Sequence, residues 1–216
     1  MNAELQAYQI AEAVDFDPAV FHIQSSEAML HRAAAHYKQF LETLGLYNPE
    51  TMPDIVDTPM RVAKMLREMT TPTNYTMTSF DLPKHSNGEV GDVGIVLQKD
   101  IDFASLCSHH MMPFFGIAHV AYIPGRQMVG LSKLARTVRF MAHSIGTQEA
   151  LGSAVADCLW EELEPKGVAV IIKATHSCMS CRGALAPSAT TTTSALRGVF
   201  FTDTRARTEL YEMLKV

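Results

Sequence analysis

The feature that most constrains the fold is the order in which hydrophobic periods follow one another between residues 94 and 201. Alternating or continuous apolar runs are typical of strands, and apolar residues three or four positions apart are typical of amphipathic helices. Two strand-like segments come first, two helical segments follow, and two segments rich in β-branched residues end the series. Their ranges are 94–103, 117–123, 132–143, 148–163, 168–174 and 190–201. This order predicts an α+β domain over 94–216.

Residues 1–70 are predicted to form a helical extension in front of this domain. One helix is expected from Ser26, a suitable cap, to Gly45, a suitable stop. A second is expected to start with Thr58 as its cap and Pro59 in its first turn. Residues 71–93 are mostly small, polar or proline and have no apolar period, so they are expected to form a connection.

The charge and hydropathy of the chain exclude several classes of function. A formal net charge of −5 at pH 7 argues against broad binding to the phosphate backbone of a nucleic acid, which needs a basic surface. No stretch approaches the roughly 20 apolar residues of a membrane span, and residues 1–10 do not resemble a secretory signal. We therefore expect a cytoplasmic protein with no membrane or nucleic-acid partner, in which a local cluster of cations can still bind a small anion.

Two short clusters of cysteine and histidine come directly after strand-like segments that lie far apart in the sequence. Because the ends of two strands in one sheet can converge, we expect the clusters to lie together. Thiols and imidazoles are the ligands that zinc prefers in proteins. The members are Cys107, His109 and His110 in the first cluster, and His176, Cys178 and Cys181 in the second.

The spacing fits two kinds of zinc site about equally well. A catalytic zinc takes three protein ligands and keeps a fourth position for water, and Cys107, His110 and Cys178 supply such a set. A structural zinc takes four ligands, and Cys181 would complete a closed site with the same three residues. The two histidines outside this set favour catalysis, because they can serve as acid-base groups. Ordinary buried thiols and core histidines are a less satisfactory explanation for a group of this size.

A possible anion site lies at the start of the helical segment 132–143. Ser132 follows Gly130-Leu131, and free N–H groups at a helix start attract anions, with Lys133 and Arg136 adding positive charge. On spacing alone, a solvated polar helix face explains these residues as well, and the same holds for Arg182 beside the second cluster. Similarly, an acidic residue such as Glu149 at the start of a helix needs no ligand to explain it.

Taken in order, the motifs of the chain resemble those of the GTP cyclohydrolase I family from about Thr58 to the C-terminus. Each motif is weak alone, and their joint order and spacing are very specific. They are Thr58-Pro-Met-Arg-Val-Ala-Lys64, Cys107-Ser-His-His110, His119-Val-Ala-Tyr-Ile-Pro124, Gly130-Leu-Ser-Lys133, Gln148-Glu149, and His176-Ser-Cys178 with Arg182-Gly183.

The resemblance implies a tunnelling fold whose strand-strand-helix-helix-strand-strand units associate into rings. Two pentameric rings stack into a homodecamer with active sites at subunit interfaces. Each site hydrolyses the guanine ring of GTP at C8, releases formate and rebuilds the remainder as 7,8-dihydroneopterin triphosphate. The implied zinc ligands are Cys107, His110 and Cys178, with His109 and His176 as proton donors and acceptors.

The same resemblance implies where the substrate binds. The guanine is recognised by Gln148 and Glu149, and the triphosphate is held by cations from more than one subunit. The residues implied for the triphosphate are Ser132, Lys133, Arg136 and Arg182, with Arg61 and Lys64 from a neighbouring subunit.

The sequence departs from the family pattern at three places. Ser108 stands where Glu is usual, residues 144–147 replace a segment that normally contains Arg and Pro, and Cys181 adds a thiol beside the implied metal site. These changes leave room for a non-catalytic, zinc-stabilised ring that binds a nucleotide or pterin. A tunnelling-fold enzyme acting on a pterin or deazapurine is disfavoured by the cations implied for the triphosphate. A nucleobase deaminase is disfavoured because its His-x-Glu and Pro-Cys-x-x-Cys signatures are lacking.

Overall fold

The computed structural model describes residues 26–82 and 93–215, which belong to two compact units divided between Thr71 and Pro72. Residues 1–25 of the predicted extension and 83–92 of the predicted connection lie outside the described residues. Within the described ranges, no helix is both long and apolar enough to cross a bilayer.

The first unit contains the two predicted helices, α2 (Glu27–Thr43) and α3 (Thr58–Thr70), and a short 3-10 helix, η2 (Pro53–Ile55). The prediction for α2 is confirmed at both ends. The Ser26 side chain accepts a hydrogen bond from the Met29 N–H at 3.3 Å, and Gly45 adopts a positive φ of 69° just beyond the helix. The helices pack through a small apolar core of Leu30, Ala34 and Ala63.

The predicted cap of α3 is wrong by one residue. Asp57, not Thr58, holds the N-cap position, and its carbonyl oxygen accepts the first helical hydrogen bond, from the Arg61 N–H at 3.0 Å. The Asp57 carboxylate makes no capping bond and instead accepts from the Arg61 guanidinium at 3.3 Å. Thr58 is therefore the first residue of the helix, and the predicted place of Pro59 in the first turn is confirmed.

The second unit is built on a five-stranded sheet in the order β5-β2-β3-β6-β7. The four long strands pair antiparallel, while the two-residue β5 pairs parallel with the end of β2. A separate pair, β1 with β4, places a short strand inside the segment expected to be a connection. The strands are β1 (Ser79–Asp81), β2 (Val96–Cys107), β3 (Met112–Ile123), β4 (Gln127–Val129), β5 (Ile145–Gly146), β6 (Gly167–His176) and β7 (Thr191–Gly198).

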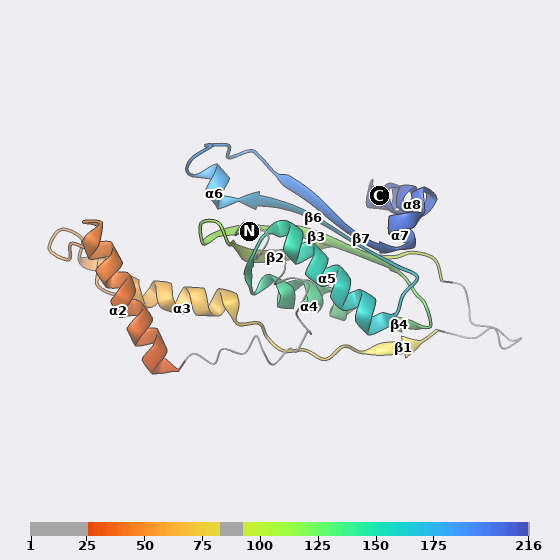
Figure 1. The fold of residues 1–216 in the computed structure, drawn as a ribbon, viewed down its shortest axis with the longest axis horizontal. Helices are drawn as coiled ribbons and strands as arrows, with labels where there is room; N and C mark the ends of the chain where they lie inside the picture. Colours follow the sequence, from red (N-terminus) through yellow and green to blue (C-terminus); the bar gives the residue numbers. More distant parts are fainter. Residues whose placement is uncertain (1–25, 83–92, 216) are drawn as a thin grey trace, which may run out of the picture. The chain divides into compact units, whose positions relative to one another are not determined.

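Two helices, α4 (Leu131–Ala142) and α5 (Gln148–Leu163), cover one face of this sheet (Figure 1). Both have fully buried residues at helical spacing, as the sequence predicts, and these meet alternate residues of the central strands in one core. Burial of this apolar surface is the main force holding α4 and α5 on the sheet. The core includes Leu134, Val138, Val155 and Leu159 from the helices, and Phe103, Phe114, Val120, Val170 and Ile172 from the strands.

The last predicted strand, 190–201, is wrong at its end. β7 stops at Gly198, where φ is 59°, and two helices follow, α7 (Val199–Thr202) and α8 (Thr204–Lys215). A Cβ atom at position 198 would lie 2.3 Å from the Lys166 carbonyl oxygen, so only glycine fits this turn. Phe200 and Leu210 then pack on the sheet face opposite α4 and α5, against residues such as Ile171. The apolar residues that suggested a strand are buried by these helices.

An irregularity in the pairing of β2 with β3, between Gln98 and Ile101, brings the backbone N–H of Asp100 to the His119 ring. This N–H donates to Nδ1 of His119 at 3.2 Å, so that nitrogen is an unprotonated acceptor. Burial lowers the pKa of His119 below its usual value near 6.5, although the Asp100 carboxylate opposes the shift. The folded chain therefore favours the neutral ring.

This contact predicts that acid destabilises the fold through His119. Because the pKa of His119 is lower in the folded chain than in the unfolded chain, the unfolded chain binds more protons. The contribution of neutral His119 to the free energy of unfolding is therefore complete above the pKa of the unfolded state, and it falls as the pH drops through that pKa. Between pH 7.5 and 5.5, we expect a larger drop in the thermal unfolding midpoint for the wild type than for His119→Asn, whose amide oxygen can still accept from Asp100. Equal drops in the two proteins would show that His119 is not the titrating group.

Candidate metal centre

The two predicted cysteine and histidine clusters meet at one edge of the sheet. β2 and β6 both run antiparallel to β3, so their C-terminal ends lie at the same edge. Cys107 is the last residue of β2, His176 is the last residue of β6, and Cys178 lies in the one-turn helix α6 (Ser177–Ser180). One ligand atom from each of these three side chains lies within 4.8 Å of the others. The predicted convergence of the clusters is confirmed for these residues.

The turn between β2 and β3 presents the other two histidines. Met111 closes this turn with a positive φ of 55°, and its N–H donates to the Cys107 carbonyl oxygen at 2.8 Å. His109 remains near the thiols, with Nδ1 3.6 Å from the Cys107 sulfur. His110 points elsewhere, since its Nε2 accepts from the Arg182 guanidinium at 3.1 Å. The structure therefore groups His176, rather than His110, with the two thiols, and the choice of ligand set from the sequence remains a prediction.

Two buried neighbours fix the orientation of the His176 ring. Phe114 stacks on it with centroids 4.7 Å apart and an interplanar angle of 2°. In the plane of the ring, His176 Nε2 lies 2.9 Å from the Oε1 atom of Gln148. Because the stack sets the plane of the ring and the Gln148 contact sets its rotation within that plane, His176 has little freedom to turn.

The hydrogen bonds of Gln148 define which nitrogen of His176 carries the proton. Gln148 is 1% exposed, and its Nε2 donates to the carbonyl oxygens of Ile172 at 3.0 Å and Thr191 at 3.1 Å. It also lies 3.0 Å from the Thr193 hydroxyl. Since carbonyl oxygens only accept, this end of the amide must be the nitrogen, and Oε1 must accept from His176. His176 therefore has its proton on Nε2 and a lone pair on Nδ1.

The electrostatics of the cluster suit a bound cation. Burial raises the pKa of the Cys178 thiol, and the neighbouring Cys107 sulfur raises it further. Burial lowers the pKa of His176, the Glu149 carboxylate opposes that shift, and His109 adds to it. Two facing thiols resist joint ionisation, and a metal ion between them relieves this because thiolates are its ligands. The donor set of two sulfurs and an imidazole fits zinc better than magnesium or calcium, which prefer oxygen.

Residues 144–147, which depart from the family pattern, brace the strand that ends at Cys107. The Ser144 carbonyl oxygen accepts from the Ser105 hydroxyl at 3.1 Å, and the Gly146 carbonyl oxygen accepts from the Ser108 N–H at 3.0 Å. The same segment then starts α5, with the Thr147 hydroxyl accepting from the Ala150 N–H at 3.2 Å. This short edge strand thus links the strand end of Cys107 to the helix that carries Gln148.

The residues predicted to bind substrate are distributed over both units. Ser132 and Arg136 are exposed on α4, whose N-cap Gly130 offers no side chain to the first N–H groups. Glu149 and Arg182 are exposed in the same unit. The remaining residues are Lys133, half-buried on α4, the buried Gln148, and Arg61 and Lys64, which lie on α3 of the other unit.

Phe114 is a site residue that the sequence pattern does not indicate. It is fully buried, and it lies directly opposite His176 in the pairing of β3 with β6. Its alternation with other apolar residues marks it only as a core position. Its partner across the sheet cannot be read from a single sequence, because register depends on pairing between distant segments.

Comparison with known proteins gives a consistent set of matches. A sequence profile of GTP cyclohydrolase I matches residues 33–215. GTP cyclohydrolase 1 of Aquifex aeolicus strain VF5 is 47% identical over 177 residues, which are 82% of this chain and 91% of the relative. GTP cyclohydrolase 1 of Hydrogenobaculum sp. strain Y04AAS1 is 44% identical over 178 residues, covering 82% and 93%. The Bacillus cytotoxicus GTP cyclohydrolase 1 is 46% identical over 164 residues, covering 74% and 84%.

Proposed function

The chain belongs to the GTP cyclohydrolase I family, and we propose that it hydrolyses the guanine ring of GTP at C8, releases formate and yields 7,8-dihydroneopterin triphosphate. The observation that supports this best is the meeting of Cys107, His176 and Cys178 at one sheet edge, beside two further histidines on the turn between β2 and β3. Such a cluster offers both metal ligands and acid-base groups to a substrate at the same edge.

Zinc is the metal that this donor set favours, held by Cys107 and Cys178, with His110 as the third ligand that the family resemblance implies. When bound, zinc acts as a Lewis acid and lowers the pKa of a coordinated water toward ~7. His110 is exposed on a turn, so its side chain is free to change rotamer toward the thiols. The contact of His110 with Arg182 would be given up in that arrangement.

His176 is proposed to transfer protons to and from the substrate through Nδ1. Because the Nε2–H of His176 is used in the hydrogen bond to Gln148, Nδ1 with its lone pair is the basic atom that remains available. His109, next to Cys107, is the second acid-base group. Glu149, exposed at the start of α5, can accept hydrogen bonds from N1–H and the 2-amino group of guanine, a pattern that adenine lacks.

The triphosphate is proposed to bind cations from more than one subunit. In this arrangement Ser132, Lys133, Arg136 and Arg182 serve one site, and Arg61 and Lys64 reach it from a neighbouring copy. The uncapped N–H groups at the start of α4 add to the attraction. This sharing requires a neighbouring copy of the chain, and we propose the homodecamer of two stacked pentamers that the family resemblance implies.

Gln148 is proposed to position His176 rather than to recognise guanine directly, since both ends of its amide are already engaged inside the protein. We expect Gln148→Met, similar in volume, to lower kcat by roughly 10- to 100-fold, because a misplaced catalytic group has effects of this order. The KM for GTP should stay within about twofold of the wild-type value, since the change removes no contact that binds substrate and transition state equally. Gln148→Glu should retain more activity, because a buried carboxyl is held neutral and can both donate and accept.

The measurement is kcat and KM for both variants, together with the ¹⁵N shifts of the His176 ring. If Gln148 positions His176, the Nε2–H tautomer of His176 should be lost in Gln148→Met. A large rise in KM with unchanged kcat would instead assign Gln148 to guanine recognition.

The proposed activity is tested by anaerobic purification with metal analysis, followed by incubation with GTP. Release of formate and formation of a fluorescent pterin triphosphate are the expected results. A chain with stoichiometric zinc that binds GTP and releases no formate would instead be a nucleotide-binding ring without catalysis, which the departures at Ser108 and residues 144–147 would then explain.

A further inference from the structure

Arg182 and His110 form a contact beside the metal centre. The Nη1 atom of Arg182 lies 3.1 Å from Nε2 of His110, although the two residues are 72 positions apart in the chain. Both residues are exposed. Among residues 26–82 and 93–215, this is the only hydrogen bond or ion pair that the Arg182 side chain makes. A cation assigned above to the triphosphate is thus bound to a histidine assigned above to the metal.

The backbone around Arg182 is held in a closed turn next to α6. The Arg182 carbonyl oxygen accepts from the Leu185 N–H at 3.3 Å, and the Ala186 N–H donates to the Met179 carbonyl oxygen at 3.0 Å. Leu185 has a φ of 48°, in the left-handed region that leucine rarely adopts. Such a conformation persists where the surrounding structure determines it. The turn therefore fixes the backbone of Arg182, while its long exposed side chain can change partner.

The contact with Arg182 uses the lone pair that His110 needs to bind a metal. A guanidinium donates hydrogen bonds and never accepts them, so Nε2 of His110 is the acceptor and Nδ1 of the neutral ring carries the proton. A histidine ligand binds a metal through an unprotonated ring nitrogen. A neutral ring has one such nitrogen, and here Arg182 occupies it. His110 can therefore bind Arg182 or a metal ion, and not both at once.

A phosphate group is a stronger partner for Arg182 than the His110 ring is. An anion adds a Coulomb attraction to the guanidinium that a neutral imidazole lacks. Arginine and phosphate also commonly form two parallel hydrogen bonds, whereas His110 accepts one. Binding of a phosphate to Arg182 is thus expected to release His110.

We propose that Arg182 is a positioning residue that keeps His110 away from the metal centre until the phosphate chain of the nucleotide binds its guanidinium. Once released, His110 can join Cys107 and Cys178 as the third ligand. Phosphate binding and zinc binding then favour one another, and such coupling is reciprocal. The inference rests on the proposed function, in that it takes His110 as a metal ligand and Arg182 as a phosphate residue.

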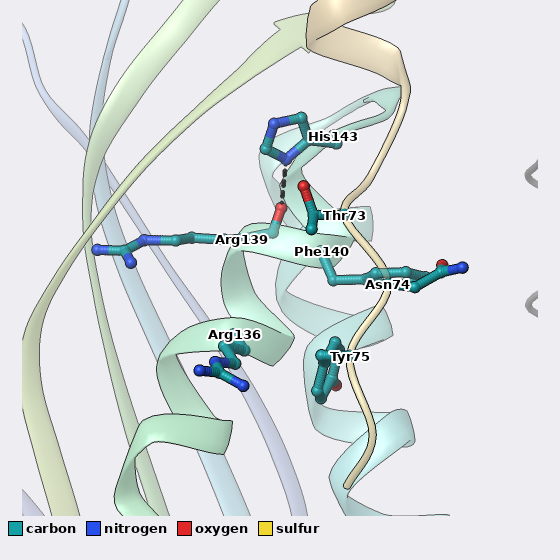
Figure 2. Close-up of a pocket in the computed structure, with 7 residues that line it drawn as sticks. All are labelled: Thr73, Asn74, Tyr75, Arg136, Arg139, Phe140 and His143. Atoms are coloured by element: carbon teal, nitrogen blue, oxygen red, sulfur yellow. Dashed lines mark hydrogen bonds between the residues drawn. The ribbon is translucent and has the colours of Figure 1, made fainter.

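Arg136 provides a matched comparison, because it is also assigned to the triphosphate. It lies on α4 and lines a cavity of about 430 Å³, together with Arg139 and His143 of the same helix and the extended segment 73–75 (Figure 2). The described residues that line this cavity include no member of the metal centre. Replacing Arg136 therefore removes a cation of the same proposed role without changing any partner of His110.

The zinc dissociation constant of the full-length protein tests the coupling without turnover. Starting from the zinc-loaded protein, a competing chelator lowers the free Zn²⁺ concentration in steps, with and without inorganic tripolyphosphate. Because the chelator sets the free Zn²⁺ concentration, zinc bound by tripolyphosphate itself does not distort the result. We expect tripolyphosphate to tighten zinc binding by the wild type about three- to tenfold, the order of one hydrogen bond.

The variants assign this effect to the contact itself. Arg182→Met should bind zinc about three- to tenfold more tightly than the wild type without tripolyphosphate, and adding tripolyphosphate should change its affinity little. Arg136→Met should match the wild type without tripolyphosphate. In a His110→Ala background, measured at higher free Zn²⁺, Arg182→Met should leave the zinc affinity unchanged. Thermal unfolding checks that each variant is folded.

Two results would overturn the inference. One is equal zinc affinity in the wild type and Arg182→Met. The other is the same gain from Arg182→Met in the His110→Ala background, which would be a general effect of the positive charge. Formate release from GTP separates the inference from the proposed function. A wild type that releases formate while its zinc affinity ignores tripolyphosphate removes the inference alone, and coupled binding without formate release removes the function alone.

Discussion

Replacing Cys178 with alanine is expected to remove zinc from the chain and to abolish formate release from GTP together. The variant leaves one thiol, Cys107, and imidazoles at the metal centre, and a zinc site that loses one of three protein ligands loses most of its affinity. Formate release should fall by roughly 10³-fold or more, because a water with a pKa near 7 is available only at the metal. The measurement is metal content by mass spectrometry beside the formate assay.

A matched control is available in Cys158→Ala. Cys158 is another thiol of the same unit, and burial raises its pKa to about 11, so it is poorly suited to bind a metal as a thiolate. This variant should retain zinc and formate release. Cys181→Ala tests the closed four-ligand site, because only that arrangement requires the Cys181 sulfur for metal binding. Stoichiometric zinc together with full activity in Cys178→Ala would contradict the proposed metal centre.

The order of elements could be predicted from the sequence because each element carries its own local pattern. α5 matches its predicted range, 148–163, since Thr147 caps it and apolar residues recur along one face. The strands β2, β3 and β6 were found for the same reason, with ends that differ by a few residues. The α+β class and the tunnelling fold are confirmed. Local signals of this kind do not depend on distant parts of the chain.

The misplaced end of the last predicted strand depends on contacts between distant residues. The sequence around Gly198 does not indicate that the chain must turn there to avoid Trp160 and the Lys166 carbonyl oxygen. The predicted last strand therefore runs on through the residues that form α7. The convergence of Cys107 with Cys178 was predictable because strand ends share an edge. By contrast, the hydrogen bond between Gln148 and His176 depends on how α5 packs against β6 and β7. A single sequence does not specify this packing.

The second large effect is expected at His176, whose replacement by alanine should keep zinc and lose turnover. If His110 is the third ligand, the metal remains bound through Cys107, Cys178 and His110 in His176→Ala. Loss of a positioned acid-base group typically lowers a rate by about 10²- to 10⁴-fold. His110→Ala should instead lose zinc and turnover together. Metal content and kcat for the two variants, measured side by side, distinguish a ligand from a proton-transfer group.

The structure makes this comparison decisive, because it gives each histidine a different partner. His176 lies with the two thiols, yet its ring is fixed by Phe114 and Gln148, whereas His110 accepts from Arg182 on an exposed turn. If His176→Ala loses zinc and His110→Ala keeps it, the arrangement in the structure is the ligand set, and proton transfer must pass to His109 or His110. In that case the hydrogen bond to Gln148 would orient a metal ligand, a role that such partners commonly have in zinc sites.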